Sequence, residues 1–299
     1  MTRWVPIVDV VSRRRFLGTA LATAAASATS ATSAAFANLA APPQMKLSFM
    51  TFVCPDWPIE KIVAFARQAQ YDGVEIRVDV GHRHGISSAS PANTRQAVRK
   101  LFRDEGIEVA AVATSVQFAS PKAEDHKKNL AAAKANLDLA GDLGAAVVRI
   151  FAGGGIPKLT PAAAQQVAAA FDEVGEYAKP RGVCPVLECG HDIIRGAAEA
   201  AEVLGRVRTD NFGALWNDSK MDDATFAALK KRIRHFHVHD EVLDPRNTNL
   251  IETARRMKSI GYRGYVSLEI IWGKNVPEDV LSETASRLKR QIAEGLSTS

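Results

Sequence analysis

The feature that most constrains the fold is a recurring unit, a short apolar or β-branched run followed by a longer segment with helical periodicity. Eight such runs are expected as strands, at residues 47–52, 73–77, 108–113, 146–151, 183–188, 212–216, 233–238 and 265–269. Amphipathic segments lie between them, for example 58–70, 123–143, 161–178 and 277–294. Several begin with proline or a small polar residue, as helices do. Continuously apolar strands are buried on both faces, and their alternation with helices favours parallel pairing.

Eight strand–helix units in about 250 residues predict an α/β fold, a (β/α)8 TIM barrel. An open, doubly wound sheet is the alternative, but no predicted strand is followed by a Gly-x-Gly-x-x-Gly turn. The glycines at 153–155 indicate a loop after the fourth strand and are a weak signal alone. Because active sites of TIM barrels lie at the carboxyl ends of the strands, the last residues of each strand are the ones to inspect.

The amino-terminal segment resembles a twin-arginine (Tat) export signal. Residues 12–17 read Ser-Arg-Arg-Arg-Phe-Leu, a weakly apolar run follows, and Ala-Phe-Ala at 35–37 supplies a small-x-small cleavage pattern. A disordered tail with chance arginines is the alternative. We therefore expect a signal peptide at 1–37, a linker at 38–45 and a single barrel domain at 46–299. The mature protein would be periplasmic or otherwise extracytoplasmic, exported folded by the Tat machinery and not stably inserted in a membrane.

The composition, 46% hydrophobic and 24% charged, is typical of a folded globular protein. Removing residues 1–37 takes away four arginines and one aspartate, so the formal charge falls from +5 to +2. The basic balance is thus partly a property of the signal, and we expect no nucleic-acid partner. Cys54, Cys184 and Cys189 lack metal-type spacing and allow at most one disulfide.

The predicted strand ends are rich in oxygen and imidazole donors. Along the chain these residues are Glu75, Arg77, His82, His84, Arg149, Glu188, His191, Asp192, Asn217, Asp218, Lys220, His235, His237, His239 and Glu269. Of the seven histidines in the chain, only His126 lies outside this set. A scatter of surface histidines would not gather at one end of one barrel, so the set indicates a site.

The seventh strand shows which of its histidines share a face. Alternate residues of a strand point the same way, so His235, His237 and His239 lie on one side. If that side is the barrel interior, the imidazole nearest the carboxyl end is best placed to bind a ligand. A solvated run of histidines is the alternative.

Two predicted strands end in glutamate, Glu188 on the fifth and Glu269 on the eighth. Burying these carboxylates is costly unless each is paired or bound to a cation. An ion pair with Arg149 or Lys220 is one solution and a metal ion is the other. Carboxylates together with an imidazole predict one hard or borderline divalent ion, Mn²⁺ in the first place and Mg²⁺, Co²⁺ or Zn²⁺ as alternatives.

Several motifs together resemble the xylose isomerase-like TIM barrels, the sugar phosphate isomerase/epimerase superfamily. They are the order of the units, Asp72-Gly73-Val74-Glu75, Leu187-Glu188, the His-x-His strand with Asp240 three residues after His237, and the final Glu269. The resemblance covers about residues 45–295 and extends to ketose 3-epimerases, hydroxypyruvate isomerases and inosose dehydratases. It implies one metal ligand from each of strands five to eight, and by motif three of these are Glu188, His237 and Glu269.

The sixth strand departs from the family pattern. The family often reads Leu-Trp/Phe-Asp-x-x-His there, and the same register places Asn217 in the metal position and Lys220 in that of the substrate histidine. An amide oxygen can bind a hard ion, but with less charge. Asp218 would take its place if a one-residue bulge followed Asn217.

The resemblance implies a metal-dependent isomerase or epimerase that forms an enediolate on a keto sugar. Glu188 and Glu269 would be the catalytic acid and base. The predicted substrate contacts are His84, Arg149, His191, Lys220 and Trp272. A dehydratase or lyase acting on 3-keto-glycosides at the same site is an alternative, as is a non-catalytic sugar-binding protein with a decayed metal site. An enzyme of the endonuclease IV type is disfavoured because it needs a richer multi-metal cluster, and assembly as a homo-oligomer is left open.

Overall fold

The structure, a computed structural model, describes residues 44–153 and 155–297. The predicted signal peptide at 1–37 lies outside the described residues, as does most of the predicted linker. The export signal and the domain boundaries therefore stay predictions.

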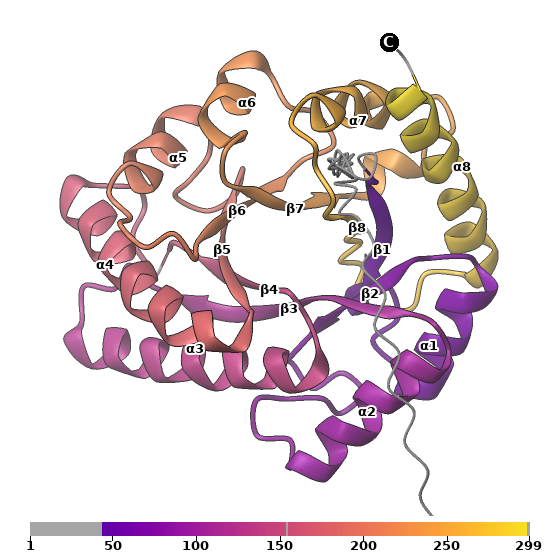
Figure 1. Cartoon of the computed structure of the whole chain (residues 1–299), viewed down its shortest axis with the longest axis horizontal. Helices are drawn as coiled ribbons and strands as arrows, with labels where there is room; N and C mark the ends of the chain where they lie inside the picture. The colour runs from indigo at the N-terminus through magenta and orange to yellow at the C-terminus, as the bar shows by residue number, and fades with distance from the viewer. Residues whose placement is uncertain (1–43, 154, 298–299) are drawn as a thin grey trace, which may run out of the picture. The chain divides into compact units, whose positions relative to one another are not determined.

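Eight strands form a closed barrel in which every neighbouring pair is parallel and the strands follow chain order (Figure 1). They are β1 (Lys46–Met50), β2 (Gly73–Arg77), β3 (Glu108–Gln117), β4 (Val147–Phe151), β5 (Cys184–Cys189), β6 (Gly213–Asn217), β7 (Ile233–Val238) and β8 (Tyr265–Leu268). The predicted TIM barrel is confirmed. Strand β3 runs four residues further than expected because Gln117 pairs with Phe151 beyond an irregularity in the ladder.

Within the described part of the chain, eight α-helices surround the barrel (Figure 1). They are α1 (Ile59–Gln68), α2 (Ala92–Asp104), α3 (Ala123–Leu143), α4 (Pro161–Ala178), α5 (Ala197–Leu204), α6 (Asp223–Leu229), α7 (Asn249–Ser259) and α8 (Glu278–Ser297). Local signals explain several of their ends. The Thr160 hydroxyl accepts the Ala163 amide at the start of α4, and Asp222 accepts the Thr225 amide at the start of α6. Helix α3 ends at Gly144, whose φ of 83° is a left-handed conformation that glycine adopts without strain.

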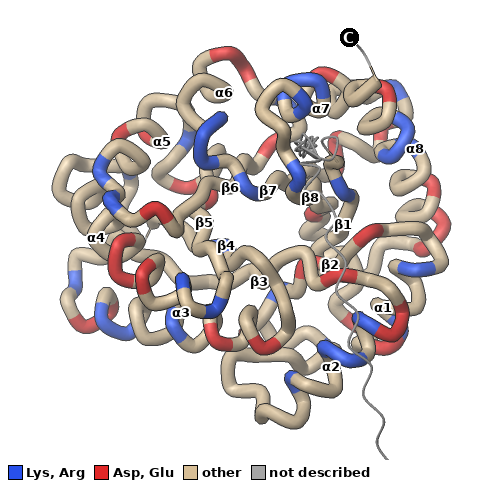
Figure 2. The backbone as a smooth tube through the Cα atoms, viewed as in Figure 1, with Lys and Arg blue, Asp and Glu red and all other residues tan. Residues whose placement is uncertain are grey.

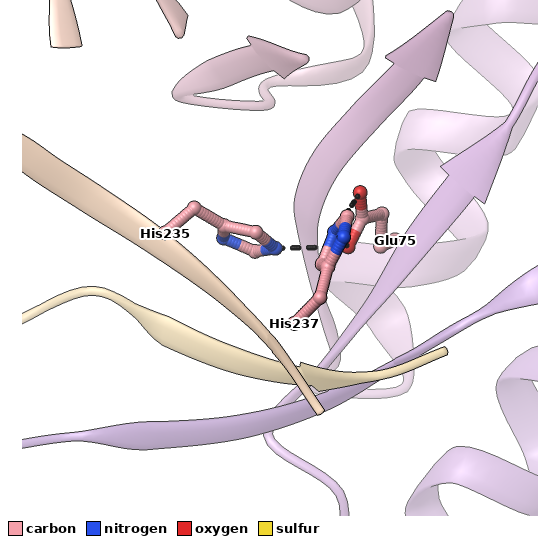
Figure 3. A group of neighbouring side chains, drawn as sticks. All are labelled: Glu75, His235 and His237. Atoms are coloured by element: carbon pink, nitrogen blue, oxygen red, sulfur yellow. Dashed lines mark hydrogen bonds and ion pairs between the residues drawn. The ribbon is translucent and has the colours of Figure 1, made fainter. Parts of the chain in front are cut away.

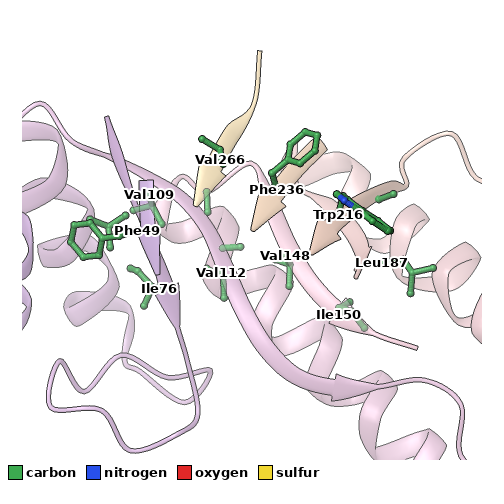
Figure 4. Packing of buried hydrophobic residues seen from close by; sticks show 14 of the residues in the cluster. Phe49, Ile76, Val109, Val112, Val148, Ile150, Leu187, Trp216, Phe236 and Val266 are labelled. Atoms are coloured by element: carbon green, nitrogen blue, oxygen red, sulfur yellow. The ribbon is translucent and has the colours of Figure 1, made fainter. Parts of the chain in front are cut away.

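The outer faces of the strands pack against the helices. Figure 4 shows this layer, in which residues such as Phe49, Ile76, Val148 and Phe236 are fully buried. The ring of Phe49 on β1 packs edge-on against Tyr71 at a centroid distance of 4.8 Å. Burial of this apolar layer is the main driving force for folding.

The inward-facing side chains change from apolar to polar along the barrel axis. Near the amino ends of the strands a small apolar cluster fills the interior, made of Ala111, Val147, Val186 and Leu215. Because side chains alternate along a strand, the next inward-facing residues lie two positions further on. On β4, β5 and β6 these are Arg149, Glu188 and Asn217. The interior is therefore apolar at one end and polar at the carboxyl end.

The outer surface carries mixed charge. Figure 2 shows lysine and arginine interspersed with aspartate and glutamate around the ring of helices. Across the described ranges, no helix combines the length and the apolar character needed to cross a membrane.

Candidate active site and metal centre

A buried histidine pair and a glutamate meet across the barrel interior. His235 and His237 of β7 both point inward, and Glu75 reaches them from β2, which is not a neighbour of β7 in the sheet (Figure 3). The Glu75 carboxylate lies 2.8 Å from His235 Nε2 and 3.1 Å from His237 Nε2. All three side chains are fully buried. The two histidines lower the pKa of Glu75 well below its usual value, against the effect of burial, so Glu75 accepts and both Nε2 atoms donate.

The opposite edge of the His237 ring faces the carboxyl end of the barrel. His237 Nδ1 lies 3.1 Å from Asn217 Oδ1 and 3.1 Å from Glu269 Oε2. Burial acts to lower the pKa of His237, but Glu75 and Glu269 outweigh it and raise that pKa to about 10. In turn, His237 outweighs the burial of Glu269 and lowers the pKa of that carboxyl to about 2. One nitrogen and two oxygens thus converge from three adjacent strands.

Glu188 forms a buried ion pair with Arg149. Arg149 Nε lies 3.1 Å from Glu188 Oε2, and both side chains are almost fully buried. This is one of the two solutions that the sequence allowed for the carboxylate. The pairing is incomplete: among the described residues, neither Glu188 Oε2 nor Nε and Nη1 of Arg149 has a hydrogen-bond partner. Arg149 also helps to lower the pKa of Glu269, so its charge acts on both glutamates.

These donors match the requirements of a divalent cation. His237 Nδ1, Asn217 Oδ1 and Glu269 Oε2 face one another. One imidazole and two oxygens suit a hard or borderline ion. Glu188, on the neighbouring strand β5, has a buried carboxylate oxygen that lacks a hydrogen bond within the described part of the chain, but it does not lie within this group. In such a centre Glu75 would orient the His237 ring by accepting its other N–H, the usual arrangement for a metal-binding histidine.

A second grouping of potential ligands lies deeper in the barrel. Atoms of Glu75, His235 and His237 all lie within 4.8 Å of one another. We call this the inner grouping, and the set of His237, Asn217 and Glu269 the outer grouping. The two share His237, but the inner grouping uses the opposite ring nitrogen. The inner grouping is fully buried, whereas Asn217 and its neighbour His239 in the outer one are partly exposed. Only the outer grouping offers access to a substrate, so we treat it as the candidate catalytic centre.

The structure distinguishes the two residues proposed for the sixth-strand position. Asn217 pairs directly with His237 in the β6–β7 ladder, and the irregularity of β6 falls between Ala214 and Leu215 rather than after Asn217. Asp218 is exposed, and its Oδ1 accepts the backbone N–H of Lys220 at 2.9 Å. The amide of Asn217 therefore faces the candidate centre, and Asp218 and Lys220 lie on the exposed loop that follows.

The remaining predicted substrate contacts differ in their surroundings. His84 is buried, and both ring nitrogens are used by the protein: Nδ1 accepts from the Ile86 amide and Nε2 lies 3.2 Å from the carbonyl oxygen of Arg77. His191 is 54% exposed, with Nδ1 3.9 Å from Glu188 Oε1. Trp272 is 42% exposed on the loop after β8. His191 and Trp272 are thus accessible, whereas His84 is held within the protein.

Three residues of the site were among the donors at the predicted strand ends but received no role from the sequence, although strand alternation contained a signal for each. Glu75 and Arg77 alternate on β2 and so share its inner face. His239 follows His237 in the same alternation, and its Nε2 lies 2.9 Å from Asn217 Oδ1. The sequence showed which face these residues occupy, but not which residues of distant strands lie opposite them.

We expect Glu75→Gln to weaken divalent metal binding by about tenfold, because a residue that orients a ligating histidine typically contributes this much or more. Glutamine keeps an acceptor oxygen but loses the charge that holds two imidazole N–H groups. The measurement is a metal titration followed by calorimetry. Unchanged affinity in a variant that keeps its thermal stability would contradict the orienting role of Glu75.

The chain shares its fold with known enzymes. Residues 63–291 match the family described as xylose isomerase-like TIM barrel. No curated protein matches the sequence.

Several solved structures are similar. An L-ribulose 3-epimerase aligns with a TM-score of 0.69 at 19% identity, covering 85% of this chain and 95% of the other. A D-psicose 3-epimerase from Clostridium cellulolyticum H10 aligns with 0.68 at 13% identity, covering 85% and 100%. A 3-keto-D-glucoside 4-epimerase from E. coli aligns with 0.64 at 15% identity, covering 84% and 100%. At such identities the likeness shows the fold alone.

Proposed function

The chain belongs to the xylose isomerase-like TIM barrel family, and from this premise we propose that it is a metal-dependent sugar isomerase or epimerase acting on a keto sugar. The observation that carries the proposal is the convergence of Asn217, His237 and Glu269 at the carboxyl end of the barrel, 3.1 Å between ring nitrogen and each oxygen. Active sites of this fold occupy that end. The similar solved structures include sugar epimerases.

His237, Asn217, Glu269 and Glu188 would hold one divalent ion, with Mn²⁺ the first expectation. When bound, such an ion supplies a Lewis acid that stabilises negative charge developing on the substrate's carbonyl oxygen. Glu75 holds the His237 ring in place from the interior. Arg149 holds the Glu188 carboxylate through its ion pair.

Glu188 and Glu269 are the proposed acid and base. Glu188 lies on β5 and Glu269 directly follows β8, three strands away around the barrel, so they approach a substrate between them from different sides. One removes the proton from the carbon next to the carbonyl, which leaves an enediolate. The other returns a proton to a neighbouring carbon or to the opposite face of the same carbon. The first outcome is isomerisation and the second is epimerisation.

A lyase or dehydratase that acts on 3-keto-glycosides is the second candidate. After the same proton abstraction, the electron pair would expel a β-substituent, which leaves with a proton. The observation that favours it is Lys220, an exposed ammonium group on the loop directly after Asn217, where it is able to protonate a leaving group. The fold similarity to a 3-keto-D-glucoside 4-epimerase is compatible with such a substrate.

The decisive experiment has two stages. Metal analysis of the purified protein should find about one divalent ion per chain. Keto sugars and 3-keto-glycosides are then incubated with the protein in D2O, and deuterium at the carbon next to the carbonyl is measured by NMR. Deuterated isomers support the first proposal, and loss of a substituent supports the second. If every compound tested stays unlabelled, a non-catalytic sugar-binding protein is the better account.

We also propose that the protein is exported by the twin-arginine route. Replacing both Arg13 and Arg14 by lysine should leave the protein in the cytoplasm with residues 1–37 attached, because that pathway reads the arginine pair. Fractionation and amino-terminal mass analysis provide the measurement. The substitution Arg3→Lys, outside the pair, is the matched control and should not affect processing. Normal cleavage of the double variant would refute the assignment.

A further inference from the structure

Arg77 is a buried cation without a carboxylate partner. Its side chain is 6% exposed at the end of β2. Nη1 donates to the carbonyl oxygens of Val78 and Ala113, and Nη2 donates to the Ser115 hydroxyl, while Nε has no partner in the described ranges. No carboxylate of the described residues lies within ion-pairing distance of it. A buried charge of this kind is costly unless something else compensates it.

Arg149 is a second buried guanidinium at the carboxyl end of the barrel. It is 1% exposed, and Nε and Nη1 make no hydrogen bond within the part of the chain that the structure describes. In the sheet, Arg77 pairs with Ala113 and Ala113 pairs with Arg149, so the two arginines lie at the same level of the barrel, with β3 between them. Burial and the charge of Arg149 lower the pKa of Arg77 to about 10, whereas Glu269, Asp79 and Glu188 act in the opposite direction.

Both guanidinium groups are stacked on aromatic rings. Arg149 Cζ lies 4.0 Å from the ring centre of Phe151, and Arg77 Cζ lies 5.4 Å from that of Phe52. A guanidinium whose flat face is covered donates hydrogen bonds along its edge. Donors in one plane bind a carboxylate or a phosphate in a bidentate way, so the geometry predicts an oxyanion, and the charge balance of the centre selects the singly charged carboxylate.

The net charge of the metal-loaded centre also favours the binding of a singly charged anion. Glu75, Glu188 and Glu269 carry three negative charges, whereas Arg77, Arg149 and a divalent ion carry four positive ones. With neutral histidines, one positive charge is left over. An aspartate at position 217 would cancel it, but Asn217 does not. Asp79, on the loop after β2, also acts on Arg77, but it is exposed and its carboxylate accepts from Ser88 and Asn136, so it is not counted in the buried centre.

We propose that the substrate of this site is a keto sugar acid, whose carboxylate binds to the edges of Arg77 and Arg149. This inference rests on the proposed function, because the carboxylate belongs to the same molecule whose carbonyl reacts. The anion completes the pairing of the two buried cations and neutralises the excess charge of the loaded centre.

Three sugars that differ at one carbon test the inference. D-Fructuronate, D-fructose and D-fructose 6-phosphate share a ketone and carry at C6 a carboxylate, a hydroxymethyl group and a phosphate ester. Calorimetry on the Mn²⁺-loaded protein should show D-fructuronate binding at least tenfold more tightly than the other two, the scale of a hydrogen bond to a charged group. Equal affinities, no detectable binding of D-fructuronate, or tightest binding of the phosphate would each overturn the proposal.

Substitutions of Arg77 and Arg149 test whether the carboxylate binds to these two side chains. Arg77→Gln and Arg149→Gln should each lower the ratio of D-fructuronate affinity to D-fructose affinity by tenfold or more. Arg77→Lys keeps the charge, should remain folded if Arg77→Gln does not, and should retain part of the preference. Arg246→Gln is the matched control, because Arg246 is exposed and pairs with Asp244. A preference that survives both Arg77 variants and Arg149→Gln would refute the assignment.

Deuterium exchange separates this inference from the proposed function. Exchange into D-fructose with no preference for D-fructuronate would refute the carboxylate site and leave the enzyme class standing. Preferential binding of D-fructuronate without exchange into any keto sugar would refute the enzyme class and leave the anion site standing.

Discussion

Glu188→Gln and Glu269→Gln are each expected to lower deuterium exchange at the substrate carbon by about 100-fold or more. A positioned acid or base contributes on this scale, and an amide cannot exchange protons as a carboxylate does. Both substitutions preserve shape and an oxygen near the centre. The initial rate of label incorporation from D2O, measured by NMR with a keto sugar that the wild-type protein labels, is the readout.

The metal content of these variants decides how the loss is interpreted. If the ion is retained while exchange is lost, the glutamates act in proton transfer as well as in binding. Glu108→Gln is the matched control. This glutamate lies at the opposite end of the barrel, where it pairs with Lys46 and Tyr265, and its loss should leave exchange unchanged. Wild-type exchange in both Glu188→Gln and Glu269→Gln would contradict the proposed roles.

His237→Gln is expected to lose the bound divalent ion, with affinity falling at least 100-fold, because His237 belongs to both groupings of potential ligands, through Nδ1 in the outer one and Nε2 in the inner one. The measurement is metal content after purification and calorimetric titration. Circular dichroism and thermal melting establish whether the variant is folded. A folded His237→Gln protein that holds a full equivalent of metal would show that the ligand set is wrong.

His235→Gln distinguishes the outer grouping from the inner one. His235 binds Glu75 as His237 does, but within the described ranges it makes no hydrogen bond or ion pair with Asn217 or Glu269. If the ion occupies the outer position, His235→Gln keeps it, and Asn217→Asp binds it more tightly by adding a charged ligand. If the ion occupies the inner position, His235→Gln loses it and Asn217→Asp has little effect.

The barrel could be predicted from the sequence because its signals are local. The apolar run 184–189, the helical period of 161–178 and the cap at Thr160 each depend on neighbours within a few residues. Eight strand–helix units in sequence then predict that the parallel sheet closes into a barrel. Strand alternation likewise predicted that His235 and His237 share a face.

Which residues meet across the barrel was decided by the tertiary structure. Glu75 lies 160 residues from His235 in the chain, and their contact depends on closure of the barrel and on the stagger between strands. The residue at the sixth-strand position of the site likewise could not be decided from the sequence. The sequence allowed either Asn217 or Asp218 at the centre, and only the register of β6 against β7 places Asn217 opposite His237.

The sequence by itself therefore determined the order of strands and helices, the shared face of the histidines on the seventh strand and the end of the barrel that carries polar residues. The tertiary structure alone decided that Glu75 holds His237, that Glu188 pairs with Arg149 and that no carboxylate of the described residues pairs with Arg77. The physical reason is that side-chain alternation is a property of one strand, whereas charge compensation in a closed barrel is a property of all eight strands together.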